Sequence, residues 1–109
     1  MTALILPEPI AAYFVADQQS PEAVVRCFTP QAVVKDEGRS HVGLDAIRSW
    51  KLEAASRYTY TSEPFAWVQQ DGRQRVTSRV TGNFPGSPVD LQYDFRLERG
   101  LIASLEITL

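Results

Sequence analysis

The sequence has few of the residues on which covalent cross-links and metal sites depend. It contains one cysteine, Cys27, and one histidine, His41. A single cysteine excludes an internal disulfide and a cysteine-rich zinc site. A single histidine excludes a metal site built from two histidines and one carboxylate. We therefore predict that the protein binds no metal.

Long apolar runs and targeting features are also missing. The apolar stretch before Pro7 is short, and no run approaches the roughly 20 residues that a membrane-spanning helix needs. The start of the chain lacks the basic segment and cleavage site of a secretory signal peptide. We therefore expect a cytoplasmic protein with no membrane partner.

Charge and motifs exclude further functional classes. The net charge is −2, and nine of the eleven basic residues are arginines scattered along the chain, so nucleic acid is not an expected partner. The sequence contains no G-x-S-x-G element, no arguable serine–histidine–aspartate set and no glycine-rich phosphate loop. Without a cofactor motif, any chemistry would have to be cofactor-independent proton transfer.

What is present suits one globular domain, residues 1–109, with 44% hydrophobic and 22% charged residues. The first half reads as helical. Residues 7–19 are predicted to form a helix, because apolar positions recur at helical spacing. The positions at i, i+3, i+4 and i+7 of this stripe are Ile10, Tyr13, Phe14 and Asp17.

Two further helices and a short strand follow. Ser20 is a suitable N-cap for a helix over residues 21–28, which we expect Pro30 to end. The β-branched segment 32–36 predicts a short strand that ends at Asp36. After a turn, Gly43 opens the longest helix, in which Ile47, Trp50 and Ala54 share one face.

From Tyr58 onward the hydrophobic pattern has a period of two, which predicts strands. Asp71-Gly72 is a strong hairpin signal between two of them, and residues 85–88 form a turn before the next. Arg99-Gly100 marks a last tight turn. In the final segment the alternation places four residues on one face: Leu101, Ala103, Leu105 and Ile107.

Three helices followed by about four long antiparallel strands predict an α+β domain, with the helices on one face of the sheet. A strongly curved sheet wrapped around a long helix can enclose a cone-shaped hollow, where a ligand pocket would lie.

Two segments carry a resemblance to a known family: F-x-x-x-A-V-V-x-D, from Phe28, and G-x-D-A-I-R-x-W, from Gly43. Their order resembles the nuclear transport factor 2-like superfamily, which includes ketosteroid isomerases and SnoaL-like polyketide cyclases. The resemblance covers essentially the whole chain. It implies three helices packed on a curved, mostly antiparallel sheet, a pocket inside the cone, and a homodimer formed through the outer sheet face.

The resemblance also implies site residues. Asp36 stands where the isomerases have their catalytic aspartate, and Tyr13 where a helix tyrosine donates a hydrogen bond. Tyr93 aligns with a protonated carboxylic acid of the isomerases, and Asp94 is one residue away, on the opposite strand face. The pattern therefore matches at two of three positions, although a tyrosine could also donate to an oxyanion.

Each of these residues has a second interpretation. Asp36 shares a strand face with Ala32 and Val34, so it either points into the hollow as a general base or ends the strand in solvent. Tyr13 and Tyr93 are pocket donors or ordinary core tyrosines. His41 takes part in proton transfer at the pocket mouth or lies on the surface.

Aromatic side chains are expected to line the hollow and to favour a small apolar or aromatic ligand that contains a carbonyl group. The expected lining residues are Phe14, Phe28, Trp50, Tyr58 and Phe95. The leading hypothesis is a small-molecule-binding protein, in its catalytic form an isomerase or cyclase that removes a proton next to a carbonyl. The alternative is a non-catalytic dimeric module that binds a ligand or a protein.

Overall fold

The fold consists of three helices packed against one six-stranded sheet in the computed structural model, which describes residues 4–109. The helices are α1 (Glu8–Asp17), α2 (Pro21–Val25) and α3 (Leu44–Arg57). The strands are β1 (Phe28–Asp36), β2 (Arg39–Val42), β3 (Tyr60–Gln70), β4 (Arg73–Gly82), β5 (Val89–Glu98) and β6 (Leu101–Thr108).

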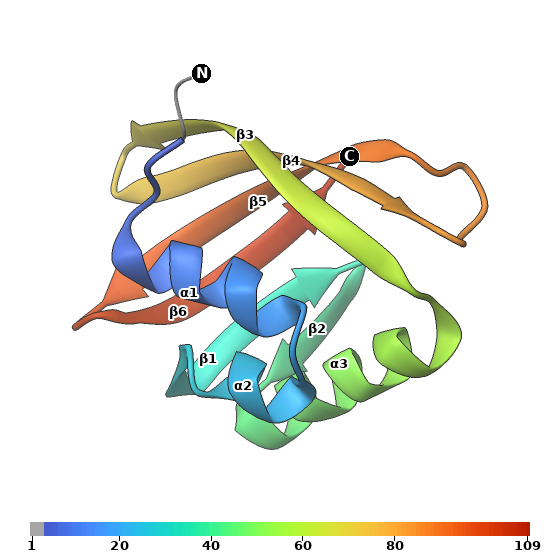
Figure 1. The fold of residues 1–109 in the computed structure, drawn as a ribbon. Helices are drawn as coiled ribbons and strands as arrows, with labels where there is room; N and C mark the ends of the chain where they lie inside the picture. Colours follow the sequence, from blue (N-terminus) through green and yellow to red (C-terminus); the bar gives the residue numbers. More distant parts are fainter. Residues whose placement is uncertain (1–3) are drawn as a thin grey trace.

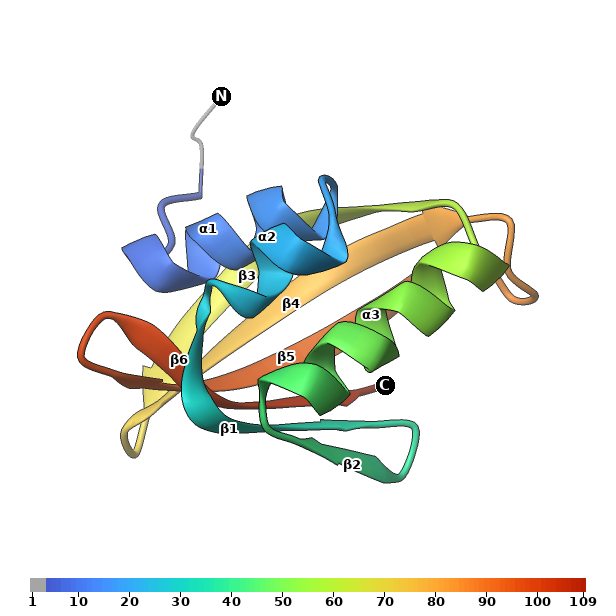
Figure 2. The same cartoon turned by 90° about the horizontal axis from the view of Figure 1, so that it is seen from below.

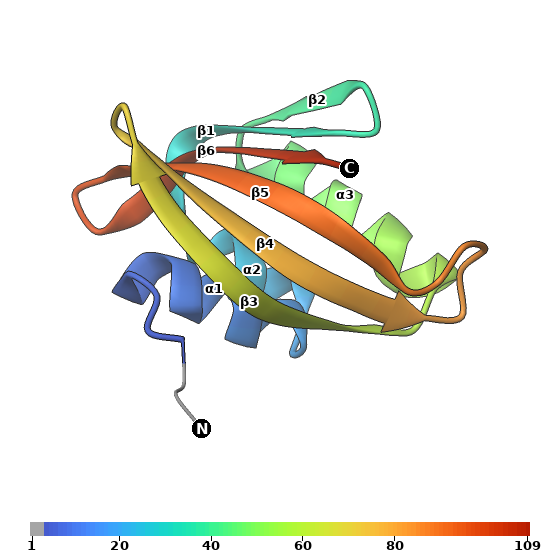
Figure 3. The same cartoon turned by 90° about the horizontal axis from the view of Figure 1, so that it is seen from above.

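The strands follow the order β2-β1-β6-β5-β4-β3 across the sheet. All neighbouring pairs are antiparallel except β1 and β6, which are parallel. The sheet curves strongly, and all three helices lie on its concave side (Figure 1 and Figure 2). Viewed from the other side, β3, β4 and β5 cross in front of the helices with no helix over them (Figure 3). The predicted α+β architecture is therefore confirmed.

Local sequence signals account for most element ends. The Ser20 hydroxyl accepts a hydrogen bond from the Ala23 amide at 3.1 Å and caps α2 as expected. The predicted hairpin joins β3 to β4 through Asp71 and Gly72, both with positive φ, the conformation that a two-residue type I′ turn requires. Arg99 and Gly100, which also both have positive φ, form the corresponding turn between β5 and β6.

The second helix is shorter than predicted, and the strand after it is longer. α2 ends at Val25, and Phe28 already pairs with Ile102 of β6. Pro30 does not end a helix; it lies within β1, where the pairing register with β6 shifts between Phe28 and Val33. A proline is tolerated there because the irregular stretch does not need its missing N–H.

The turn expected after Asp36 contains a strand that the sequence pattern did not reveal. Glu37 and Gly38 both have positive φ and close a tight hairpin between β1 and β2. His41 therefore lies in β2, directly opposite the buried Val34, rather than in a loop.

The predicted alternation of the last strand is wrong in its first half. Ile102 and Leu105, three residues apart, are the buried positions of β6. The register between β5 and β6 shifts between Arg96 and Leu97, so an irregularity in the ladder inserts an extra residue. Such a bulge reverses which residues face the core on either side of it.

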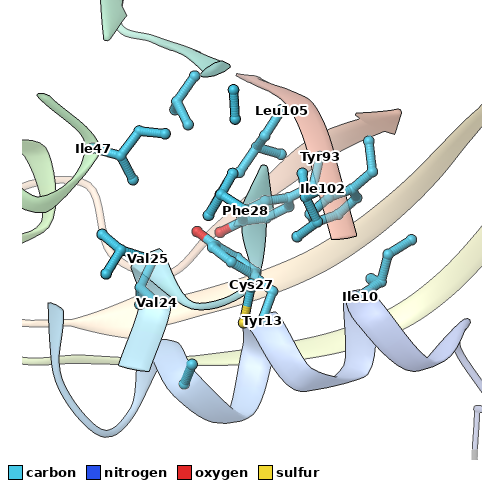
Figure 4. Packing of buried hydrophobic residues seen from close by; sticks show 14 of the residues in the cluster. Ile10, Tyr13, Val24, Val25, Cys27, Phe28, Ile47, Tyr93, Ile102 and Leu105 are labelled. Atoms are coloured by element: carbon cyan, nitrogen blue, oxygen red, sulfur yellow. The ribbon is translucent and has the colours of Figure 1, made fainter. Parts of the chain in front are cut away.

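An aromatic cluster fills the centre of the domain. Tyr13, which is fully buried, packs edge-on against Phe14, Phe28 and Phe95, with ring centroids 5.3–6.0 Å apart. Figure 4 shows Tyr13 reaching from α1 toward Phe28 and Tyr93. These edge-to-face contacts add to the free energy of burying the rings. The hollow implied by the resemblance is therefore largely occupied by side chains.

The outer sheet face is polar. Arg75 pairs with Asp94 at 2.7 Å, and Arg79 pairs with Asp90 at 2.9 Å, each arginine bonding its carboxylate through two nitrogens. A homodimer formed through this face stays a prediction. In residues 4–109 no helix is long and apolar enough to cross a membrane.

The approach of β4 to the start of β3 yields a stability prediction. Gly82 lies opposite Tyr60, and a Cβ at this position would meet the Thr59 carbonyl oxygen and, at 2.9 Å, the Tyr60 Cα. We expect Gly82→Ala to lower the free energy of unfolding by about 1–3 kcal/mol, the usual cost of overpacking. Urea denaturation of this variant and of Thr81→Ala, at the exposed neighbouring position, measures the effect. An equal, small effect of both changes would contradict the expectation.

Candidate functional site

Asp36 ends β1 on the inner face of the sheet. The ladder places it beside Ile107 of β6, and Ile107 lies beside Tyr93 of β5. Residues opposite each other in neighbouring strands point to the same side of a sheet. Since Tyr93 is buried at 5% exposure under the helices, Asp36 also points toward the interior, and it is half-buried.

Trp50 of α3 holds the Asp36 carboxylate in place. Its indole Nε1–H donates a hydrogen bond to Asp36 Oδ2 at 3.0 Å. Trp50 is 9% exposed and lies on the same helix face as the fully buried Ile47, so packing fixes the direction of the indole. The carboxylate is thus oriented by a donor that can neither accept nor release a proton in ordinary acid–base chemistry.

A small cavity of about 120 Å³ lies next to these two residues, and we call it the Asp36 cavity. Four polar side chains contribute to its wall: Asp17, Asp36, Lys51 and Tyr60. Rings of Trp50, Phe84 and Tyr93 form much of the rest. Larger hollows of about 300 and 490 Å³ lie over the outer sheet face and are lined mainly by charged side chains such as Arg73, Asp94 and Arg96.

A buried charged network forms one end of the Asp36 cavity. The Lys51 ammonium donates to Asp17 Oδ1 at 2.5 Å and to the Tyr60 hydroxyl at 3.2 Å. The Tyr60 hydroxyl donates to the same Asp17 oxygen at 2.9 Å. The side chains of Lys51 and Asp17 are only 9% and 3% exposed. The network therefore joins α1, α3 and β3 through charges that water hardly reaches.

Aromatic rings surround the Lys51 ammonium. Its Nζ lies 4.3 Å from the ring centroid of Trp50, 5.5 Å from that of Tyr13 and 5.8 Å from that of Tyr60. Cations are attracted to the faces of aromatic rings at such distances. Trp50 consequently contacts both charged ends of the site: its N–H binds Asp36 and its ring adjoins Lys51.

Tyr13 lies in the aromatic core beside the cavity. It is fully buried, but its side chain is not among those that form the wall of the Asp36 cavity. Its hydroxyl has no hydrogen-bond partner among the described residues. Burial, followed by the negative charge of Asp17, raises the pKa of Tyr13 well above its ordinary value, so this phenol stays protonated at neutral pH.

Tyr93 and Tyr60 are also held in the neutral form. Burial is the main cause that raises the pKa of Tyr93, and burial followed by Asp17 raises that of Tyr60. The structure also answers which residue of β5 faces the interior. Tyr93 points into the Asp36 cavity, whereas Asp94 pairs with Arg75 on the outer face.

The other residues proposed from the sequence divide into three groups. His41 stacks on Trp50 with ring centroids 5.9 Å apart, so it contacts the residue that binds Asp36. Phe14, Phe28 and Phe95 belong to the closed aromatic core and do not form the cavity wall. Tyr58 lies outside the cavity, 36% exposed, and packs edge-on against Phe84.

The buried charged network was not predicted from the sequence. A signal was present for both of its ions, because each stands on the apolar stripe of its helix. Asp17 follows Tyr13 and Phe14 at helical spacing, and Lys51 follows Ile47 by four residues. A charge at a stripe position indicates either a helix end in solvent or a buried pair, and only the fold decides between these. In residues 4–109, no group of three histidine, cysteine or carboxylate side chains comes together as metal ligands would.

Comparison with known proteins assigns the fold to a family. The chain is 40% identical to a candidate polyketide cyclase from Sinorhizobium meliloti, with a TM-score of 0.90 over 94% of this chain and 95% of the other. The chain belongs to the nuclear transport factor 2-like (SnoaL-like) superfamily. No protein-family model and no curated protein sequence matches it.

Two more distant structures share the fold of this superfamily member. A protein with a ketosteroid isomerase-like fold from Catenulispora acidiphila, solved with trimethylamine, is 17% identical, with a TM-score of 0.85 over 96% of this chain and 87% of that one. The epoxide hydrolase/cyclase-like enzyme SalBIII, involved in pyran ring formation in salinomycin, is 21% identical, with a TM-score of 0.79 over 92% and 86%. The three structures are thus a candidate polyketide cyclase, a protein with an isomerase-like fold and a cyclase-like enzyme.

The lone hydroxyl of Tyr13 leads to a stability prediction. We expect Tyr13→Phe to raise the free energy of unfolding by up to about 1 kcal/mol, because it removes a buried polar group that has no partner. The matched variant Tyr60→Phe should lower that energy by about 1–3 kcal/mol, since it breaks the bonds to Asp17 and Lys51. Urea denaturation at neutral pH compares the two. Destabilisation by Tyr13→Phe would show that its hydroxyl has a partner.

The raised pKa values of Tyr13, Tyr60 and Tyr93 predict how stability depends on alkaline pH. An unfolded chain releases these phenolic protons near pH 10, whereas the folded protein retains them. Stability is therefore fully present below about pH 10 and falls as pH rises further, by about 1.4 kcal/mol per pH unit for each phenol that differs. Denaturation curves at several alkaline pH values measure this slope, and Tyr13→Phe should reduce it. An unchanged slope in that variant would contradict the assignment.

Proposed function

We propose that this protein binds a small carbonyl compound in the Asp36 cavity and catalyses cofactor-independent proton transfer next to the carbonyl, as an isomerase or cyclase does. The observation that carries the proposal is the position of the Asp36 carboxylate. The carboxylate lies in the wall of the Asp36 cavity, which is open to one side. The Trp50 indole fixes it through one oxygen, while Oδ1 forms no hydrogen bond within residues 4–109. A fixed carboxylate with one free oxygen is suited to act as a general base.

The chemistry requires only groups that the cavity provides. Asp36 Oδ1 would take a proton from the carbon next to the carbonyl, and the electron pair of that C–H bond would form an enolate. The enolate oxygen needs a hydrogen-bond donor for as long as it bears negative charge. Return of the proton from Asp36 to the far carbon of a conjugated enolate completes an isomerisation. In a cyclisation the enolate carbon attacks a second carbonyl, the C=O π bond of that carbonyl opens to an alkoxide, and the alkoxide takes the proton back from Asp36.

The size of the cavity limits the ligand. At about 120 Å³ it is smaller than the roughly 300–1,000 Å³ of typical ligand pockets. A ligand of a few heavy atoms, or one carbonyl-bearing end of a larger molecule, is the group that fits. The aromatic rings of Trp50, Phe84 and Tyr93 favour an apolar or aromatic body for that ligand.

The filled interior favours a second candidate function. Because Phe14, Phe28 and Phe95 occupy the centre of the cone, the domain can also be a binding module that performs no reaction. The two functions differ in what they require of Asp36. Catalysis needs its carboxylate to exchange protons with a ligand, whereas a module needs it only for the hydrogen bond to Trp50.

Exchange of hydrogen for deuterium in small ketones tests the catalytic function. A panel that includes acetone and cyclohexanone is incubated with the protein in D₂O, and proton NMR follows the loss of the signals from hydrogens next to the carbonyl. We expect Asp36→Asn to lower the exchange rate by about 10²–10⁴-fold, the usual contribution of a general base. Asparagine keeps an oxygen that can accept from Trp50, so the fold should be retained.

Glu37→Gln is the matched control, because Glu37 is the exposed carboxylate next to Asp36 in the hairpin turn. This variant should exchange at the rate of the unmodified protein. Equal rates for Asp36→Asn and the unmodified protein, or no exchange above the buffer rate in any ketone, would favour the binding module instead.

A further inference from the structure

We propose that Lys51 is a catalytic residue of the Asp36 cavity: its ammonium binds the ligand's oxyanion, the role that the family resemblance assigns to Tyr13. The inference rests on the proposed function, since the oxyanion is the enolate of that reaction. Lys51 forms part of the cavity wall together with Asp36, and Tyr13 does not. Of these two donors, the cation from α3 therefore lies in the cavity wall and the phenol from α1 does not.

The hydrogen bonds of Lys51 leave it one donor for a ligand. An ammonium group has three N–H bonds. Within the described part of the chain, two of them are directed to Asp17 and to the Tyr60 hydroxyl. The proton of that hydroxyl is itself directed to Asp17, so Tyr60 orients Lys51 but has no proton to offer a ligand.

Stability alone gives a weak reason for this ion pair. Removing two charges from water costs several kcal/mol for each, and apolar side chains of similar volume often stabilise a protein equally well. A role in binding a ligand would explain why the pair is present in spite of this desolvation cost. Asp17 keeps the site close to neutral around Lys51, and the ring of Trp50, 4.3 Å from Nζ, supports the cation on another side.

Trp50 also determines how the base and the cation are placed relative to each other. It contacts Asp36 through its indole N–H and Lys51 through its ring. Both groups therefore contact the same side chain, Trp50, which is only 9% exposed and is held rigidly by packing. A ligand that lies between them would have its acidic C–H directed toward Asp36 and its oxygen toward Lys51, the preorganisation that enolate formation requires.

A second depression lies on another side of the charged network. It has a volume of about 270 Å³ and lies between the end of α1, the end of α3 and the start of β3. Asp17, Lys51 and Tyr60 belong to its wall as well as to that of the Asp36 cavity. The charged network thus lies between the two spaces.

Binding of an oxyanion probe tests the proposal without knowledge of the substrate. The probe is 4-nitrophenol, whose phenolate form absorbs visible light and resembles an enolate oxygen on an apolar ring. Its affinity and its apparent pKa when bound are measured by absorbance, and acetate is titrated in parallel by NMR as a smaller oxyanion. The ionisable groups in the cavity wall are Asp17, Asp36, Lys51, Tyr60 and Tyr93. Tyr13 and His41 lie outside this wall, His41 stacked on Trp50.

The variants separate a lost donor from a lost fold. Lys51→Met alone leaves the buried Asp17 carboxylate without its counter-ion and is expected to fold poorly. The double variant Asp17→Asn with Lys51→Met removes both charges and leaves the net charge unchanged. We expect it to weaken binding of the phenolate and of acetate by about 10–100-fold, the equivalent of one charged hydrogen bond. Lys51→Arg should retain most of the affinity, and Lys35→Met, on the outer face, all of it.

Two results would overturn the proposal: equal affinity of the double variant and the unmodified protein for both oxyanions, or no binding of either one by the unmodified protein. Asp36→Asn distinguishes this failure from failure of the proposed function. By removing a negative charge near the probe, it should strengthen phenolate binding even if it has no effect on ketone exchange. Loss of oxyanion affinity in the double variant, with ketone exchange unaffected by Asp36→Asn, would support Lys51 and reject the base.

Discussion

The buried ion pair between Asp17 and Lys51 joins distant parts of the chain. The two residues are 34 positions apart and belong to α1 and α3, and Tyr60 adds β3 to the same network. The apolar contacts that also hold the helices on the sheet are non-directional. A buried charge has no such freedom, because movement away from its partner leaves it desolvated and unpaired. The pair therefore fixes the helices at the place where the cavity lies.

Patterns within the sequence were sufficient for most of the fold. Period-two segments and the turns at Asp71-Gly72 and Arg99-Gly100 predicted the long strands, because a strand with one buried face must alternate. The same reasoning failed where alternation breaks. The bulge in β6 buries both Ile102 and Leu105, and the short strand β2 is too brief and too exposed to show a period. Both features depend on pairing with a distant strand.

The candidate site was predictable only in part, for a similar reason. Asp36 could be placed on the inner face, because Ala32, Val34 and Asp36 are alternate residues of one strand and so point to the same side of the sheet. Its hydrogen bond to Trp50 and the pairing of Lys51 with Asp17 join different elements, so no local period reports them. Tyr13 shows the limit of a helical stripe. Its stripe position correctly predicted burial, but it could not show that Phe14 and Phe28 pack against its ring and leave its hydroxyl without a partner among residues 4–109.

The interior combines a closed aromatic core with a cavity lined by charged side chains. Most of the cone is closed by aromatic packing around Tyr13, which stabilises the domain and leaves little volume. At one end the packing stops, and the remaining space is bounded by two carboxylates, one ammonium and the face of Trp50. Apolar filling would have served stability better there, since each of these charges must be compensated within the protein. The charges lie where the cavity is, and the rigid indole of Trp50 contacts one carboxylate, Asp36, and one ammonium, Lys51. Such an arrangement is suited to bind a ligand in which an acidic C–H bond and an oxygen lie a few ångströms apart.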